Sequence, residues 1–191
     1  MTRFTGLMTV ALAHGLLYGC AFVQQTLPGL TMTDAEMVGV LNSFSEEEVE
    51  AAELARRTST TSDVQAFAGR VLDEHRQLAE HNARLSRQLH ITPREPALAS
   101  ELKANHQQAM HDLEGKQGSD FDRAYVEYEI ARHVHAFGLM KTAAESEATL
   151  PLQQELIRTG PDLLSHLSAA RALERRLVAK EDQASESPQS P

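Results

Sequence analysis

Apolar residues recur at intervals of three, four and seven along most of the chain, which is the spacing of one face of an α-helix. This pattern predicts helices over about 33–58, 62–90, 97–114 and 119–148, and another from about 151 onward. We find no convincing alternation of apolar and polar residues and no Asn-Gly or Asp-Gly hairpin turn. The sequence therefore predicts an all-α protein, an antiparallel four-helix bundle with an additional short helix.

Local motifs refine the ends of these helices. Thr33 and Glu36 have the spacing of a capping box, so the first helix is expected to begin there. Ser43 or Ser45 is expected to restart that helix. A Gly-Pro pair at 160–161 lies within the last apolar stripe and predicts a kink, because proline removes one backbone hydrogen bond.

The first twenty residues differ from the rest of the chain. After Arg3, residues 4–19 contain no Asp, Glu, Lys or Arg. This stretch is shorter than the roughly 20 apolar residues that a membrane-spanning helix needs, and it is more typical of a secretory signal.

The only cysteine, Cys20, stands where this apolar run ends. The sequence Leu17-Tyr18-Gly19-Cys20 resembles a bacterial lipobox, although Tyr18 is larger than the usual residue. In a lipobox the cysteine becomes the lipidated first residue, so Cys20 is predicted to attach the protein to a membrane. Ala21, rather than Asp, follows it, as in lipoproteins of the outer membrane. Two alternatives remain, an ordinary signal peptide cut near residues 11–13 and an uncleaved anchor.

These features divide the chain into four segments. We expect a signal peptide over 1–19, a lipid-anchored tether over 20–31 and a helical bundle domain over 32–180. Residues 181–191 are rich in Gln, Ser, Glu and Pro, which predicts a disordered tail.

Composition and motifs exclude several functions. The chain has 18 Lys and Arg against 27 Asp and Glu, and this net charge of −9 argues against nucleic-acid binding. A single cysteine excludes an internal disulfide and a multi-cysteine zinc or iron–sulfur site. No Gly-x-Ser-x-Gly, His-Glu-x-x-His, P-loop or dinucleotide-binding motif occurs, which disfavours the corresponding enzyme classes.

Three histidines stand on apolar faces of three different predicted helices: His75, His133 and His166. A bundle would bring them together if they lie at the same height. Glu48 on the first helix and Asp162, four residues before His166, are the candidate carboxylates. Neutral imidazoles with one or two carboxylates suit zinc, copper, nickel or iron.

Two other interpretations of these histidines deserve comparison. Buried histidines often only donate hydrogen bonds that tie helices together. Di-iron bundles use Glu-x-x-His motifs on two helices, and none occurs here, because Glu129 and His133 are four residues apart. An oxygen-handling di-iron site is therefore disfavoured.

Four local patterns carry a family resemblance. They lie at 48–55 (Glu-Val-Glu followed by Leu-Ala), 64–75 (ending in Asp-Glu-His), 121–133 and 161–167. In this order the chain resembles the bacterial domain-of-unknown-function family 4142, over about residues 32–178. The resemblance implies an exported, ferritin-like helical bundle. It implies no activity and no site residue, and the usual Asp-His pair of the family is Glu74-His75 here.

Three functional hypotheses follow. The first is a non-enzymatic, lipid-anchored periplasmic bundle with a binding or envelope-support role, probed by the acylation of Cys20. The alternative is a metal-binding or metal-sensing bundle that uses His75, His133 and His166. The third is an uncharacterised enzyme with a His-carboxylate site. The lipid anchor is the only expected membrane contact, and a protein partner or small ligand stays unidentified.

Overall fold

The computed structural model describes residues 32–96, 99–144 and 149–186. These residues form five helices and no strand: α1 (Asp34–Thr58), α2 (Ser62–Gln88), α3 (Ala99–Glu114), α4 (Gly118–Ala144) and α5 (Leu150–Glu186). The all-α prediction is confirmed. Cys20, the predicted signal peptide and the tether lie outside the described residues.

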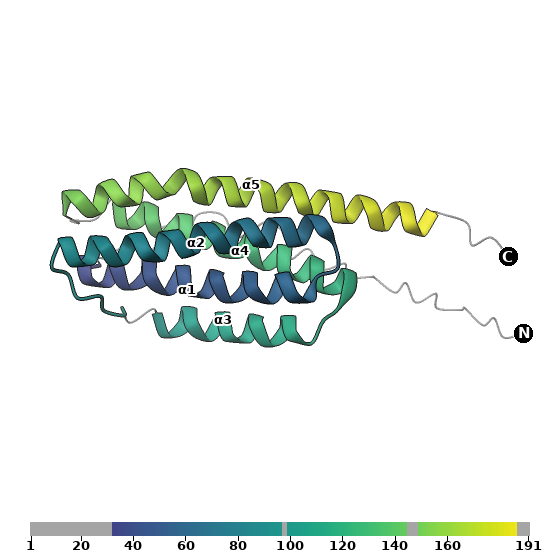
Figure 1. The fold of residues 1–191 in the computed structure, drawn as a ribbon, viewed down its shortest axis with the longest axis horizontal. Helices are drawn as coiled ribbons and strands as arrows, with labels where there is room; N and C mark the ends of the chain where they lie inside the picture. Colours follow the sequence, from purple (N-terminus) through teal and green to yellow (C-terminus); the bar gives the residue numbers. More distant parts are fainter. Residues whose placement is uncertain (1–31, 97–98, 145–148, 187–191) are drawn as a thin grey trace, which may run out of the picture.

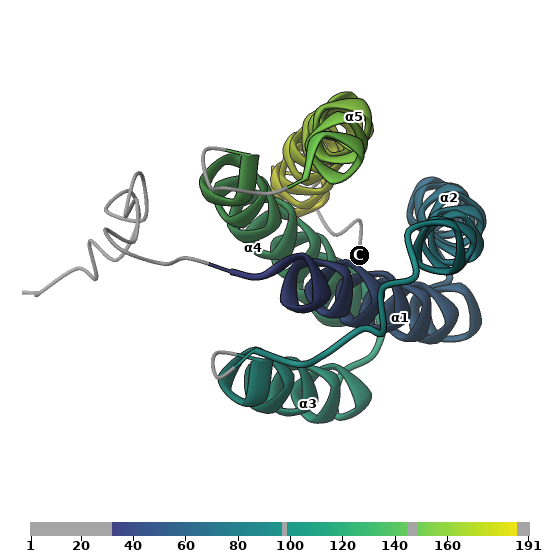
Figure 2. The same cartoon turned by 90° about the vertical axis from the view of Figure 1, so that its left-hand side faces the viewer.

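Four long helices form the bundle, and α3 lies against its outside (Figures 1 and 2). Helices α1 and α2 make one antiparallel pair and α4 and α5 another, while α1 also contacts α4 and α2 also contacts α5. Helices α2 and α4 point the same way, so the segment containing α3 must run back along the bundle to connect them. One such crossover is the connection of ferritin-like bundles.

Helix α1 begins at the predicted capping box and then continues without interruption. The Thr33 hydroxyl accepts from the backbone N–H of Glu36, and the Glu36 carboxylate accepts from the backbone N–H of Thr33. The predicted restart at Ser43 or Ser45 is wrong. The Ser45 hydroxyl instead donates to the backbone carbonyl of Leu41 at 2.9 Å, so this buried hydroxyl has a hydrogen-bond partner within its own helix.

Helix α5 runs through Pro161 and does not end there. Proline has no N–H, so the carbonyl of Ile157, one turn earlier, loses its intrahelical partner. Both residues are exposed, and water can hydrogen-bond that carbonyl instead. The helix also passes the expected domain boundary at residue 180 and reaches Glu186, and the remainder of the expected tail, residues 187–191, lies outside the described part.

Two apolar clusters make up the core of the bundle. One contains Phe121, Tyr125 and the apolar residues around 51–72, and the other contains Met37, Leu41 and Leu152 near the opposite end. Each of the four long helices also carries buried polar residues between the parts that belong to the two clusters. These residues are Glu48, His75, Glu129, His133 and His166. Burying such groups costs free energy unless they are paired, so this polar layer is the first place to look for function.

Within the described residues, no helix has an apolar stretch long enough to cross a membrane.

Candidate metal centre

The structure brings together the three histidines that the sequence places on apolar faces. His75 comes from α2, His133 from α4 and His166 from α5. One ring nitrogen from each lies within 4.8 Å of the others. Their exposed fractions are 2%, 0% and 2%, so the cluster lies inside the bundle.

The outer nitrogens of two of these rings are already engaged. His133 Nδ1 lies 2.9 Å from the backbone carbonyl oxygen of Glu129, which can only accept, so this nitrogen carries the hydrogen. His166 Nε2 contacts the Glu74 carboxylate and donates to it. Metal-binding histidines usually have this outer contact to a carbonyl or carboxylate, which orients the ring and selects the tautomer.

The inner nitrogens of the same two rings face each other. His133 Nε2 and His166 Nδ1 are 3.1 Å apart. In neutral rings with the tautomers above, both nitrogens carry a lone pair and no hydrogen. Two nitrogens bound to one ion at 2.0–2.1 Å are also about 3 Å apart, so the pair has the spacing of two neighbouring metal ligands.

His75 completes the cluster and lacks any hydrogen-bond partner in the described structure. Both of its ring nitrogens are buried and unpaired. Its ring centroid lies 5.3 Å from that of His166 and 5.8 Å from that of His133. The Phe44 ring packs against it in a T-shaped contact, with a centroid distance of 5.3 Å. Burial lowers the pKa of His75 to about 3, with the Glu48 charge opposing the shift. The ring is therefore neutral at pH 7.

His166 is held in the same state. Burial is the main cause that lowers its pKa, and the neighbouring His133 adds to the effect, while Glu74 opposes it. A neutral imidazole is the form that binds metal, because the ligand nitrogen must be free of its proton. Burial therefore keeps His166 in the neutral form that can bind a metal.

A carboxylate pair adjoins the cluster on the side of α1. Ligand atoms of Glu48, Glu129 and His133 also lie within 4.8 Å of one another. Oε2 of Glu129 lies 3.5 Å from His133 Nδ1, and the Tyr125 hydroxyl and the Glu48 carboxylate also interact with this carboxyl group. His133 thus belongs to both groups.

These two carboxylates have different protonation states. Burial raises the pKa of Glu129 well above its ordinary value, and the charge of Glu48 raises it further. Burial opposes the charged form of Glu48 too, but the protonated forms of His133 and His75, together with Arg132, favour it, so its pKa lies below its ordinary value. When these rings are neutral, Arg132 is the cation that keeps Glu48 charged. The proton of the pair therefore resides on Glu129 and the negative charge on Glu48.

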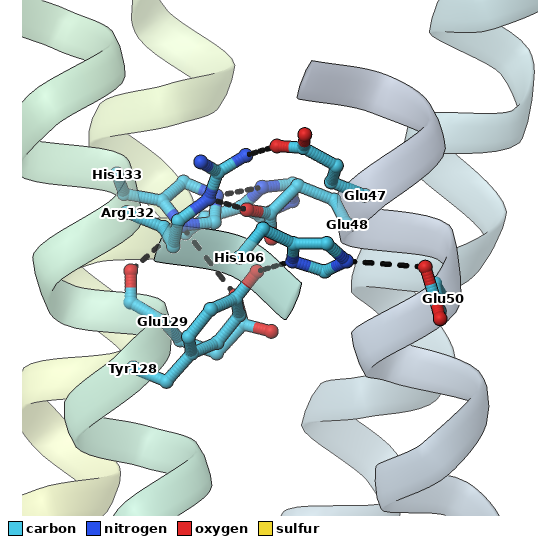
Figure 3. A network of polar contacts seen from close by, with 9 residues as sticks. Glu47, Glu48, Glu50, His106, Tyr128, Glu129, Arg132 and His133 are labelled. Atoms are coloured by element: carbon cyan, nitrogen blue, oxygen red, sulfur yellow. Dashed lines mark hydrogen bonds and ion pairs between the residues drawn. The ribbon is translucent and has the colours of Figure 1, made fainter. Parts of the chain in front are cut away.

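Arg132 balances the charge of Glu48. Its Nε lies 3.3 Å from Glu48 Oε1, and its Nη2 pairs with Glu47, as Figure 3 shows. The guanidinium carbon also lies 5.0 Å from the centre of the Phe44 ring. Arg132 of α4 therefore forms ion pairs with two carboxylates of α1, Glu47 and Glu48.

A second polar contact next to this one involves α3. His106, which the sequence pattern leaves unremarkable, is buried and lies 2.8 Å from the Tyr128 hydroxyl and 3.1 Å from a Glu50 carboxylate oxygen (Figure 3). This contact ties α3 to α1 and α4. Both ring nitrogens of His106 therefore have hydrogen-bond partners, as expected of a histidine with a structural role. The ring nitrogens of His75 have none.

Asp162 does not join the cluster. It is exposed on α5 and lies outside both groups of potential ligands found among the described residues. It lines a polar groove of about 370 Å³ between α2 and α5, together with His75, His166 and Glu74. The helical spacing to His166 is right, but Asp162 is exposed and is not among the ligand groups.

Several site residues escape the sequence analysis. Glu74 was noted only as a departure from the family pattern, yet it orients His166 from another helix. Phe44 and Arg132 have no motif that marks them. The one available indication is the spacing of Glu129 and His133, which places both on one helix face.

Comparison with known proteins identifies a family and no characterised relative. The family model for the domain of unknown function DUF4142 matches residues 21–173. No curated protein matches the chain. No solved structure matches it either.

Proposed function

We propose that this chain, which belongs to the DUF4142 family of domains of unknown function, binds a divalent transition metal through His75, His133 and His166. The family description carries no activity, so the proposal rests on the geometry of the cluster. Zinc, copper, nickel and iron are the candidate metals, because imidazole suits all four.

The observation that carries this proposal is the pairing pattern of the three rings. Histidines that only tie helices together have their polar atoms hydrogen-bonded, as His106 does. Here two rings use their outer nitrogens on fixed acceptors and turn lone pairs toward each other, and the third ring has no partner at all. One cation among the three would satisfy all the inner nitrogens.

The direct test is metal binding to the purified chain from residue 21, which contains every described residue. After removal of metals with a chelator, calorimetry and elemental analysis should show one tightly bound ion per chain with at least one of the four metals at neutral pH. Lowering the pH should weaken binding, because ligand histidines must lose their protons.

Substitutions separate a metal site from adventitious binding. His133→Gln and His166→Gln should each lose most of the affinity, whereas His111→Gln, an exposed histidine on α3, should retain it. Glu74→Gln tests the orienting contact without disturbing the core, because Glu74 is half exposed. Loss of an outer carboxylate typically weakens metal binding about 10–100-fold. No binding of any of the four metals, or equal binding by the His133→Gln and His111→Gln variants, would overturn the proposal.

We also propose that the bundle is held at the bacterial envelope, on the periplasmic side, by lipid on Cys20. The support is the lipobox-like sequence that ends at this residue and the apolar segment before it. Attachment through more than one acyl chain would hold the protein stably, since a single chain binds membranes only marginally. Ala21 after the cysteine favours the outer membrane over the inner one.

Metabolic labelling tests the anchor. Cells that express the chain are fed an alkyne fatty acid, and label should appear on the wild type and disappear from Cys20→Ala. Density-gradient separation of the two membranes should place the labelled protein with outer-membrane markers. Absence of label on the wild type would reject the anchor and leave the metal proposal untouched.

A further inference from the structure

We infer that the metal keeps one coordination position free of protein ligands, and that this position is reached through the groove between α2 and α5, where a water molecule or a small anion binds. This inference rests on the proposed metal site. It adds an exchangeable ligand, and therefore a reactive rather than a purely structural centre.

The first support is the number of protein ligands. Among the residues that the structure describes, no fourth His, Cys, Asp or Glu shares the 4.8 Å neighbourhood of the three histidines. Structural zinc sites are closed by four protein ligands, whereas reactive sites have three and leave the fourth position to water or substrate. Three imidazoles alone leave any of the four candidate metals short of a full shell.

The nearest carboxylates lie outside this neighbourhood of the three histidines. Glu74 accepts from the outer nitrogen of His166, and Asp162 is an exposed residue of the groove lining. Glu48 belongs to the separate group with Glu129 and His133, where Arg132 pairs with its Oε1 and its Oε2 has no hydrogen-bond partner.

The second support is a path from solvent. The groove of about 370 Å³ is lined by residues of α2 and α5 alone, and His75 and His166 are among them. Its other lining groups include Gln77, Ser165 and the paired Arg158, so its wall is polar and water can enter. His133 is absent from this lining and lies deeper.

The wall of the groove carries charges of both signs. It holds two carboxylates, Glu74 and Asp162, and two guanidinium groups, Arg84 and Arg158, so the wall itself selects neither sign. The charge of the exchangeable ligand is then set by the bound metal cation, which attracts a small anion.

Cobalt(II) provides the test, because its visible absorption bands respond to each change of ligand. The purified chain from residue 21 is loaded with cobalt(II) and titrated with sodium azide as the small-anion probe. We expect a saturable spectral change with one azide per cobalt. Ser165→Trp, which places a large ring in the groove, should weaken or slow azide binding at least tenfold while cobalt affinity stays unchanged.

A matched variant controls for the route. Leu102→Trp fills the separate cavity between α1, α3 and α4 and should leave azide binding as in the wild type. Cobalt binding with no spectral response to azide would overturn this inference alone and leave the metal site standing. An azide response blocked by Leu102→Trp rather than Ser165→Trp would overturn the assigned route. Failure to bind cobalt(II) and every one of the four candidate metals would overturn both proposals.

Discussion

At the scale of single residues, the protein tolerates polar groups in its interior that cost stability when no metal is bound. His75 has no hydrogen-bond partner, and Glu129 must hold a proton to remain buried. Ordinary cores avoid both situations. Each of these groups should therefore change how the free energy of unfolding of the metal-free protein depends on pH.

The first of these effects on the free energy of unfolding comes from His75. Its folded pKa of about 3 lies below the ordinary 6.5, so between these values the unfolded chain binds a proton that the folded chain excludes. Stability from this residue is complete above about pH 6.5 and is lost as the pH falls, by about 1.4 kcal/mol per pH unit. His75→Phe should flatten this slope. Chemical denaturation of the metal-free proteins at pH 7, 6 and 5 measures it, and parallel curves for both would contradict the assignment.

Glu129 should act in the opposite direction. Its folded pKa is raised above the ordinary 4.5, so above pH 4.5 the unfolded chain releases a proton that the folded chain retains. Its contribution is therefore present at low pH and is lost as the pH rises, at up to about 1.4 kcal/mol per pH unit.

Glu129→Gln keeps the shape and removes the ionisation. In metal-free protein this variant should gain stability over the wild type as the pH rises from 4.5 to 7, measured by denaturant unfolding. Glu127→Gln removes an exposed carboxylate from the same helix and should not reproduce the gain. A gain that is constant with pH would mean that Glu129 is already ionised in the folded protein.

At the scale of helices, one close backbone contact decides how the chain leaves α2. The segment after α2 crosses α1, where the backbone N–H of Arg94 donates to the carbonyl of Ala35 at 2.9 Å. Gly39 lies beneath it, and a Cβ placed there would be 2.2 Å from the Arg94 carbonyl oxygen. Only glycine permits this approach without movement of the backbone.

Two glycine substitutions test this contact against helix propensity. Gly39→Ala should destabilise the protein by about 1–3 kcal/mol, because crowding outweighs the better helix propensity of alanine. Gly69→Ala on α2 meets no atom within 4 Å and should instead stabilise by about 0.5–1 kcal/mol. Thermal or denaturant unfolding compares the two, and an equal gain for both would show that the crossing segment moves away freely.

At the scale of the whole molecule, the cluster joins three of the four long helices at the layer between the two apolar clusters. A metal there would hold α2, α4 and α5 together, and Glu48 brings α1 beside it. The contact between the two helix pairs would then depend partly on the ion. Binding to the folded state alone must therefore raise overall stability.

Metal addition should raise the unfolding temperature in proportion to its affinity. At a free metal concentration of 100 times Kd, the expected stabilisation is about 2.7 kcal/mol, and a chelator should reverse it. Differential scanning calorimetry with and without the metal measures the shift. His133→Gln should abolish the shift while His111→Gln keeps it, and a shift of equal size in both would assign the metal effect to another site.

The sequence by itself determined the helical class, the approximate bounds of five helices and the three histidines on apolar faces. Periodicity carries this information because it fixes the angle of each side chain around its own helix axis. The lipid anchor at Cys20 stays a prediction, since that residue lies outside the described part.

Only the tertiary structure decided which of these residues meet. Periodicity says nothing about the height of one helix relative to another, so the convergence of His75, His133 and His166 had to come from packing. The same packing placed Glu74 of α2 on His166 of α5 and left Asp162, at the favourable spacing, in solvent. Side-chain partners across helices depend on this register, because a contact between two helices has no trace in the local sequence of either.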